Sequence, residues 1–159
     1  MATYERSAVV AAPFEDVWAF HDSLEGLEAL TPDFVGLRIE SVEGPDGERA
    51  IDDLDVGTRA TISVRPFGVG PRQRVETTIV ERERDDESGH FVDTFSGGPF
   101  ARWRHTHRFE AVEGGTQITD HVEYALRGGA VGRTLSPIAV VGFAPAFRDR
   151  HRRTAAHLE

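Results

Sequence analysis

The sequence contains no cysteine, which excludes disulfide bonds, zinc–thiolate sites, iron–sulfur clusters and cysteine nucleophiles. It contains no lysine either, so all 18 basic residues are arginines, set against 27 acidic residues and a net charge of −9. An acidic excess with lysine avoided resembles the proteins of halophilic microbes, and we expect a hydrated, acidic surface. This charge balance argues against a nucleic-acid partner, because phosphate contacts need clustered arginine or lysine.

Long apolar runs are also missing. No stretch reaches the length that crosses a bilayer, and the N-terminus shows no basic segment leading into an apolar one. We therefore expect a cytoplasmic protein without a membrane span. With 159 residues, 39% of them hydrophobic and ten of them phenylalanine, the chain is expected to form one domain over 1–159 around one core.

Most of the chain predicts β-strands separated by glycine, proline and aspartate turns. The expected strands cover 3–11, 35–43, 58–65, 72–84, 90–96, 102–112 and 116–126. Two short helices are expected after the first strand, one starting at Pro13 and one over 24–30. Phe14 and Trp18 should pack between the first helix and the sheet, with His21 as a cap or surface residue. The predicted fold class is α+β, with a mainly antiparallel seven-stranded sheet.

The last segment is expected to form a helix that covers the apolar face of the sheet. Ser136-Pro137 predicts its start, because serine suits the N-cap and proline the first helical position. The apolar stripe of this helix comprises Leu135, Ala139, Gly142, Phe143, Ala146 and Phe147. Pro145 should kink or interrupt the helix, and the glycine-rich stretch 128–132 is expected to be a hinge, a lid loop or an exposed connector.

This order of elements resembles the helix-grip fold of the START-like, Bet v 1-like superfamily. The resemblance is carried by Val10-Ala11-Ala12-Pro13, Val17-Trp18, Leu27, Leu30, Pro32, Gly98-Pro99-Phe100, the stretch from Trp103 to Phe109, and the stretch from Thr119 to Tyr124. Within the superfamily the chain is similar to the SRPBCC ligand-binding group, often described as polyketide cyclase/dehydrase-like. Membership implies a curved sheet wrapped around the C-terminal helix and a hydrophobic cavity between them for a small molecule. It does not imply catalysis, since members include lipid and hormone carriers as well as cyclases.

The stretch from Arg102 to Phe109 alternates arginine with aromatic or histidine side chains. Period two places Trp103, His105, His107 and Phe109 on one face of a strand and the arginines on the other, wet face. A two-residue turn at Gly114-Gly115 would pair Phe109 with Asp120, His107 with Val122, His105 with Tyr124 and Trp103 with Leu126. Asp120 would then lie diagonal to His107, within reach of it.

Three interpretations of His105, His107, Asp120 and Tyr124 remain open. They form a satisfied polar network inside the sheet, or the wall of a ligand pocket, or a catalytic or two-histidine, one-carboxylate metal site. As an enzyme, a cyclase or dehydratase, the protein would use His107 and Asp120 for proton transfer. A module that binds partners through its sheet or last helix is a third class of function.

We predict a protein that binds a hydrophobic or amphipathic small molecule of lipid-like, isoprenoid or aromatic type. The expected ligand contacts are Trp103, His105, His107, Tyr124, Asp120, Phe91, Phe95, Phe143 and Phe147. Asp93 shares the strand face of Phe91 and Phe95 and could either line the cavity or be exposed. No metal and no cofactor are expected, and the sequence does not fix the oligomeric state.

Overall fold

The computed structural model describes residues 2–23, 26, 29, 36–47, 55–65 and 68–159. The described strands are β1 (Ala2–Val10), β2 (Arg38–Glu43), β3 (Arg59–Val64), β4 (Gln73–Arg84), β5 (Ser88–Gly97), β6 (Phe100–Val112) and β7 (Gly115–Leu126). The helices are α1 (Phe14–His21) and α3 (Gly129–Leu158). The seven predicted strands and the α+β class are confirmed, and most of the second predicted short helix, 24–30, lies outside the described residues.

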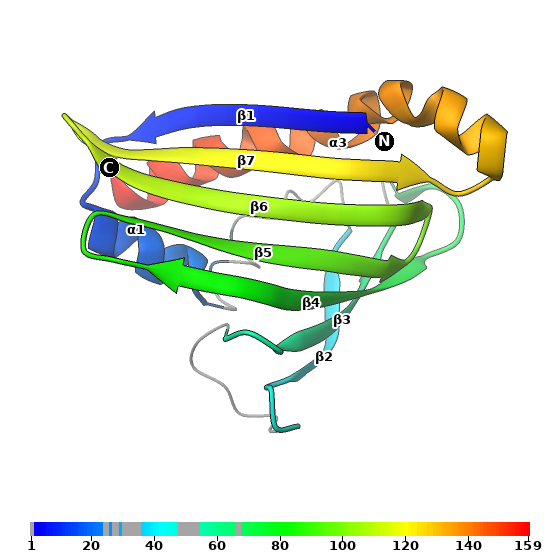
Figure 1. The fold of residues 1–159 in the computed structure, drawn as a ribbon, viewed down its shortest axis with the longest axis horizontal. Coiled ribbons are helices and arrows are strands. Elements are labelled where there is room, and N and C mark those ends of the chain that lie inside the picture. The colour runs from blue at the N-terminus through cyan, green and yellow to red at the C-terminus, as the bar shows by residue number, and fades with distance from the viewer. Residues whose placement is uncertain (1, 24–25, 27–28, 30–35, 48–54, 66–67) are drawn as a thin grey trace.

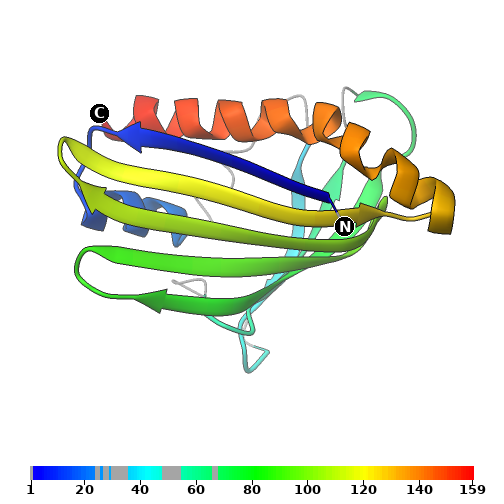
Figure 2. The same ribbon diagram turned by 45° about the horizontal axis from the view of Figure 1, so that its top comes forward.

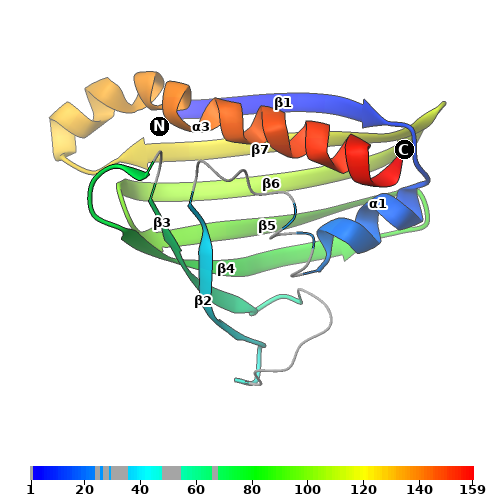
Figure 3. The same cartoon turned by 180° about the vertical axis from the view of Figure 1, so that it is seen from behind.

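The strands form one antiparallel sheet in the order β1-β7-β6-β5-β4-β3-β2. Figure 1 shows the long strands β4 to β7 running side by side, while β2 and β3 turn steeply away from them. Seen from behind, α3 crosses the sheet over β1 and β7, and α1 lies beside the C-terminal end of α3 (Figure 3). A curved antiparallel sheet with one face covered by a long helix is the helix-grip arrangement, so that expectation is confirmed.

The spacing of its apolar residues determines how helix α1 packs on the sheet. Its inward residues Phe14, Val17 and Trp18 are buried with Phe91 and Phe109 of the sheet in one core cluster. Glu15 and Asp16 occupy its first turn, where acidic side chains favour the positive end of the helix dipole. The predicted packing between helix and sheet is therefore what the structure shows.

The start of α3 differs from the prediction. The helix begins at Gly129, so the stretch 128–132 enters the helix, and the expectation of a hinge, lid or connector there is wrong. Ser136 is not a cap, because its hydroxyl donates to the carbonyl of Gly132 (2.8 Å) and accepts the backbone N–H of Leu126 (3.0 Å). This serine ties the helix to the end of β7, an interaction that no local sequence pattern announces.

Helix α3 contains two prolines: Pro137 lies inside the helix and not at its first position as predicted, and Pro145 predicts the bend that the helix shows. The parts 129–138 and 143–158 are inclined by 43°, and Figure 2 shows the first part extending past the ends of the strands. Pro145 lacks the N–H that would bond the carbonyl four residues earlier, which explains a bend at this level. Leu135 of the predicted stripe is 46% exposed, whereas Phe147 is buried. In the described part of the chain no single helix is long and apolar enough to cross a membrane; only the two parts of α3 together, as a bent pair, meet that test.

The β6–β7 hairpin has a different turn from the predicted one. Val112 pairs with Gly115, so the two turn residues are Glu113 and Gly114, with Gly114 at a φ of 87°. The predicted register is wrong by two residues: Asp120 lies directly opposite His107, Val122 opposite His105, and Tyr124 opposite Trp103. A shift of two residues keeps every side chain on its predicted face, because strand side chains alternate with period two.

Candidate functional site

Five titratable side chains meet in the middle of the covered sheet face. His105 and His107 come from β6, and the pairing of β6 with its neighbours sets Asp93 of β5 opposite His105 and Asp120 of β7 opposite His107. His151 reaches the group from α3. All five side chains are buried, and we call them the histidine–aspartate cluster.

His105 lies between the two carboxylates. Its Nε2 hydrogen-bonds Oδ1 of Asp120 at 2.7 Å, and its Nδ1 lies 3.4 Å from Oδ2 of Asp93. A neutral imidazole has one N–H, so it can donate to only one of the two aspartates. The ring therefore satisfies both carboxylates only when it carries a second proton or another cation.

His107 also lies between the two carboxylates, but its ring nitrogens face them the other way round. Its Nε2 hydrogen-bonds Oδ2 of Asp93 at 3.1 Å, and its Nδ1 lies 2.9 Å from Oδ1 of Asp120, although at an angle that gives no hydrogen bond. The two imidazole rings are neighbours, with centroids 3.6 Å apart. Two histidines thus bridge the same pair of carboxylate oxygens.

The last helix completes the cluster. Nε2 of His151 makes a short hydrogen bond to Oδ2 of Asp120. Sequence reasoning assigned no partner to His151. Its position on α3 could nevertheless have been inferred, because it follows Phe143 and Phe147 at intervals of four residues, on the side facing the sheet. That helical spacing is the signal that could have placed this histidine in the site.

The pKa values in the cluster follow from burial and from neighbouring charges. Burial opposes ionisation of Asp93 and Asp120, but the histidine contacts outweigh it and hold both pKa values below the usual range. Burial also disfavours the cation of His105, yet the charge of Asp93 and the bonds to both aspartates raise its pKa. The pKa of His107 is lowered by burial and by the neighbouring His105. The two rings are thus pushed towards opposite protonation states, His105 charged and His107 neutral.

A pocket of about 110 Å³, which we call the inner pocket, adjoins the cluster. Its lining residues are His21, Val42, Thr58, Ala60, Ile62, Thr77, Ile79, Phe91, Asp93, Phe95, His105, His107 and Arg150. Of the predicted ligand contacts, Phe91, Phe95, His105 and His107 line this pocket. Asp93, whose position the sequence left open, lines it as well.

The other predicted contacts lie elsewhere. Trp103, Tyr124 and Phe147 are buried together in a core cluster, with Phe143 packed against it. Asp120 is 1% exposed and touches the imidazoles at the nitrogens turned away from Asp93. In this structure these five residues therefore support the pocket wall or the core, and they are not among the residues that line the inner pocket.

His21 is a lining residue that the sequence placed differently. It is 4% exposed, so the expectation of a surface residue is wrong, and the reason is its helical spacing from Val17 and Trp18 on the buried side of α1. Its Nδ1 donates to the carbonyl of Val17 at 2.9 Å. Burial, with the charge of Arg150 as the next cause, lowers the pKa of His21 to about 3.

Comparison with known families agrees with this architecture. The family model described as polyketide cyclase/dehydrase and lipid transport matches residues 1–159. The chain belongs to this family. No curated protein matches the chain.

Several solved structures share the fold of this chain. Protein Ms6760 from Mycobacterium smegmatis is 19% identical with a TM-score of 0.68, over 99% of this chain and 90% of that one. Protein CV1439 from Chromobacterium violaceum is 16% identical with a TM-score of 0.67, over 99% and 96%. A START superfamily protein from M. smegmatis is 13% identical with a TM-score of 0.57, over 95% and 97%. At these identities the likeness shows the fold alone.

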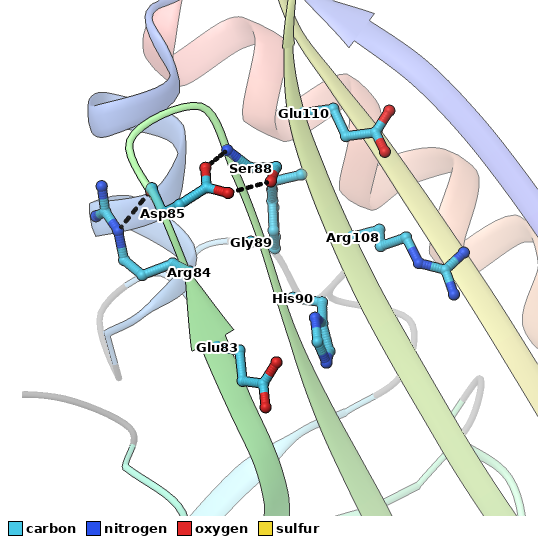
Figure 4. Close-up of a pocket in the computed structure, with 9 residues that line it drawn as sticks. Glu83, Arg84, Asp85, Ser88, Gly89, His90, Arg108 and Glu110 are labelled. Carbon is cyan, nitrogen blue, oxygen red and sulfur yellow. Dashed lines mark hydrogen bonds between the residues drawn. The ribbon is translucent and has the colours of Figure 1, made fainter.

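A second concavity lies on the outer face of the sheet, between the ends of β4, β5 and β6 (Figure 4). It measures about 350 Å³ and is lined by Glu83, Arg84, Asp85, Ser88, Gly89, His90, Arg108, Phe109 and Glu110. Although it is the larger of the two, its labelled charged side chains spread over an open surface, and Asp85 is occupied by bonds to the backbone and hydroxyl of the adjacent turn. The inner pocket is the better site, because its polar groups are buried and converge.

Chemically, the cluster can do two things for this family member. It can present a fixed polar end to a molecule in the inner pocket, and it can exchange protons, because His105 and His107 have pKa values displaced in opposite directions. Both roles use the pocket side of the rings, since Asp120 lies against the nitrogens on the other side. They also require Asp93 to release the pocket-side nitrogen that it contacts in this structure.

Proposed function

We propose that the protein binds a hydrophobic or amphipathic small molecule in the inner pocket. The observation that carries this proposal is the lining itself: apolar side chains of β2 to β5 form one part, and Asp93, His105 and His107 form a buried polar end. Specific small-molecule sites combine an apolar wall with a few placed polar groups. Family membership supports the same function class, since the family covers both cyclases and lipid transport.

The volume of the pocket limits the size of the ligand that it can hold. A volume of about 110 Å³ compares with cavities of roughly 150 Å³ that hold one benzene ring. A ring-sized aromatic, or the ring-bearing end of a longer amphipathic molecule, suits this space. Phe91 and Phe95 offer aromatic surfaces to such a ring, and the imidazoles can bond a hydroxyl or carbonyl on it.

Calorimetric titration tests this proposal with phenol, indole, geraniol and decanoate as probes. We expect phenol and indole to bind and to raise the melting temperature. Ala60→Leu, which adds carbon atoms at the pocket wall, should abolish this binding, while Val80→Leu, at a 37% exposed position of β4, should leave it unchanged. Failure of every probe to bind the wild-type protein, or equal binding by both variants, would contradict the proposal.

A second candidate function is proton-transfer catalysis of the cyclase or dehydratase type. It is favoured by the 2.9 Å distance between Nδ1 of His107 and Oδ1 of Asp120, with His107 facing the inner pocket. This role requires the tautomer of His107 with its proton on Nδ1, facing Asp120, and release of Nε2 from its hydrogen bond to Asp93. Nε2 would then accept a proton on the pocket side, and Asp120 would stabilise the resulting imidazolium.

Deuterium exchange of pentane-2,4-dione, followed by NMR, tests this second function. We expect the wild-type protein to accelerate exchange of the acidic carbon-bound protons. His107→Gln should remove the acceleration, and His121→Gln, on the outer face, should retain it. Exchange no faster than in buffer would rule out His107 as an accessible base.

A further inference from the structure

We propose that Asp93, His105 and His107 form a binding site for one divalent transition-metal ion at the polar end of the inner pocket. The three residues offer one carboxylate oxygen and two imidazole nitrogens, all within 4.8 Å of one another. They come from the paired central strands β5 and β6, whose backbones are fixed by the sheet ladder. The site does not depend on the proposed ligand, because it follows from the donor set alone.

The distances suit a metal ion. Oδ2 of Asp93 lies 3.1 Å from Nε2 of His107 and 3.4 Å from Nδ1 of His105. Zinc binds imidazole nitrogen and carboxylate oxygen at about 2.0–2.2 Å, so neighbouring ligand atoms are separated by roughly 3 Å. The two distances from the carboxylate oxygen therefore already match the separations of a coordination sphere, and all three donor atoms lie within 4.8 Å of one another.

The second carboxylate has the position of an outer-shell partner. Oδ1 of Asp120 lies 2.7 Å from Nε2 of His105 and 2.9 Å from Nδ1 of His107, which are the two ring nitrogens left over when the pocket-side nitrogens bind a metal. Metal-binding histidines usually donate their other N–H to a carboxylate, which fixes tautomer and ring orientation. His151 in turn holds Oδ2 of Asp120. One aspartate thus orients both histidine ligands.

The hydrogen bonds of the two imidazoles also favour a metal ion at the pocket-side nitrogens. Nδ1 of His107 is buried without a hydrogen-bond partner while Nε2 bonds Asp93. A metal on Nε2 would place the single proton on Nδ1, facing Oδ1 of Asp120 at 2.9 Å, where a small rotation of the ring would bring it into line. For His105, a metal on Nδ1 leaves the proton on Nε2, where it already bonds Asp120. The metal-bound tautomers therefore satisfy both rings.

The charge of the site and the types of its ligand atoms limit which ions it can bind. Two buried carboxylates are paired here with histidine rings, and a dication would balance their two negative charges. Nitrogen and oxygen donors of this kind suit zinc, iron(II) or cobalt(II), and three protein ligands leave further positions open. These open positions would face the inner pocket, where a hydroxyl or carbonyl group of a bound molecule could reach the metal.

Metal binding by the purified, chelator-treated protein tests the proposal. Zinc is titrated by calorimetry, and cobalt(II) is followed by its visible absorption. We expect one equivalent to bind, stoichiometric binding to be lost in His107→Gln, and Asp120→Asn to weaken affinity about 10–100-fold. His90→Gln and His121→Gln, which change histidines of the outer face, should bind as the wild type does.

A second measurement covers variants that do not fold. In the wild-type protein, paramagnetic cobalt(II) should broaden the amide signals of β5 and β6 around Asp93 and His107 before those of the outer turn at Asp85. The proposal is overturned if the wild type binds less than one equivalent of zinc and cobalt(II). It is equally overturned if broadening centres on surface histidines, or if folded His107→Gln binds with unchanged affinity. The titrations with phenol and indole are carried out in the presence of a chelator, so that either proposal can fail without the other.

Discussion

His151 of α3 hydrogen-bonds Oδ2 of Asp120 on β7, so the last helix is tied to the sheet by a buried polar contact. Asp120 also meets His105 and His107 through its other oxygen. This one carboxylate therefore joins three histidines from two elements. It couples the stability of the fold to the geometry of the site.

Asp120→Asn should destabilise the protein strongly. The amide keeps the shape of the side chain but removes the charge that three buried histidines share, and breaking a buried ion pair from one side costs about 3–5 kcal/mol. Urea denaturation measures the loss. Glu5→Gln is the matched control, because Glu5 pairs with His121 on the surface and should change stability by less than about 1 kcal/mol. Equal effects of the two variants would contradict a structural role for the buried pairing.

Gly115→Ala should disturb the start of β7. A Cβ atom on Gly115 would lie 2.0 Å from the carbonyl oxygen of Val10, and the residue has a φ of 152°. We expect a loss of at least about 1–3 kcal/mol in the free energy of unfolding, because the backbones of β1 and β7 must separate. The control is Gly114→Asn at the turn, where nothing lies within 4 Å and asparagine tolerates a φ of 87°. A harmless Gly115→Ala would show that the two strands are not packed this closely.

Phe147→Ala should reveal which side of α3 covers the sheet. The Phe147 ring is buried, with its centroid 4.9 Å from that of His105 and 5.6 Å from that of Tyr4. Its removal should cost about 3–5 kcal/mol, as for other buried aromatic side chains. Leu135→Ala, on the exposed side of the same helix, should change stability by about 0.5 kcal/mol or less. Thermal and urea unfolding of the two variants would show the reverse order if the helix were rotated.

The strands were predictable because their signals are local. Alternation between arginine and inward side chains over 102–109 fixed the faces of β6, and those faces are as predicted. The register was not predictable to better than two residues, because Glu113-Gly114 and Gly114-Gly115 are both acceptable turns and the choice depends on the contact of Gly115 with Val10 of another strand. The prediction for the start of α3 was wrong for a similar reason. Ser136 has the chemistry of a cap, but its hydroxyl accepts a hydrogen bond from the backbone N–H of Leu126 of β7.

The site was predictable in part. The face shared by His105 and His107, and the nearness of Asp120, followed from period two and one hairpin. Asp93 and His151 were not assigned to the cluster, since their approach depends on the β5–β6 register and on the rotation of α3, which no local pattern fixes. Tyr124 and Trp103 share the inward face but lie further along the strands, in a separate apolar cluster.

His21 should give the protein a defined dependence of stability on pH. Its pKa is lowered to about 3, first by burial and then by the charge of Arg150, whereas an unfolded histidine titrates near 6.5. Between these values the unfolded chain binds a proton that the folded protein does not. The stabilisation is therefore full above about pH 6.5 and is lost as the pH falls, by up to about 1.4 kcal/mol per pH unit.

The other titratable groups of the site determine the pH range in which this effect of His21 can be measured. Asp93 and Asp120, with lowered pKa values, lose their contributions only below about pH 4, and His105, whose pKa is raised, contributes a constant amount below about pH 6.5. His107, whose pKa is lowered, acts in the same direction as His21. Urea unfolding between about pH 4.5 and 6 should therefore show a slope that His21→Gln reduces and that His157→Gln, at an exposed position of α3, does not. An unchanged slope in His21→Gln would mean that His21 is protonated in the folded protein, and that the wall of the inner pocket carries a charge where the structure places a neutral ring.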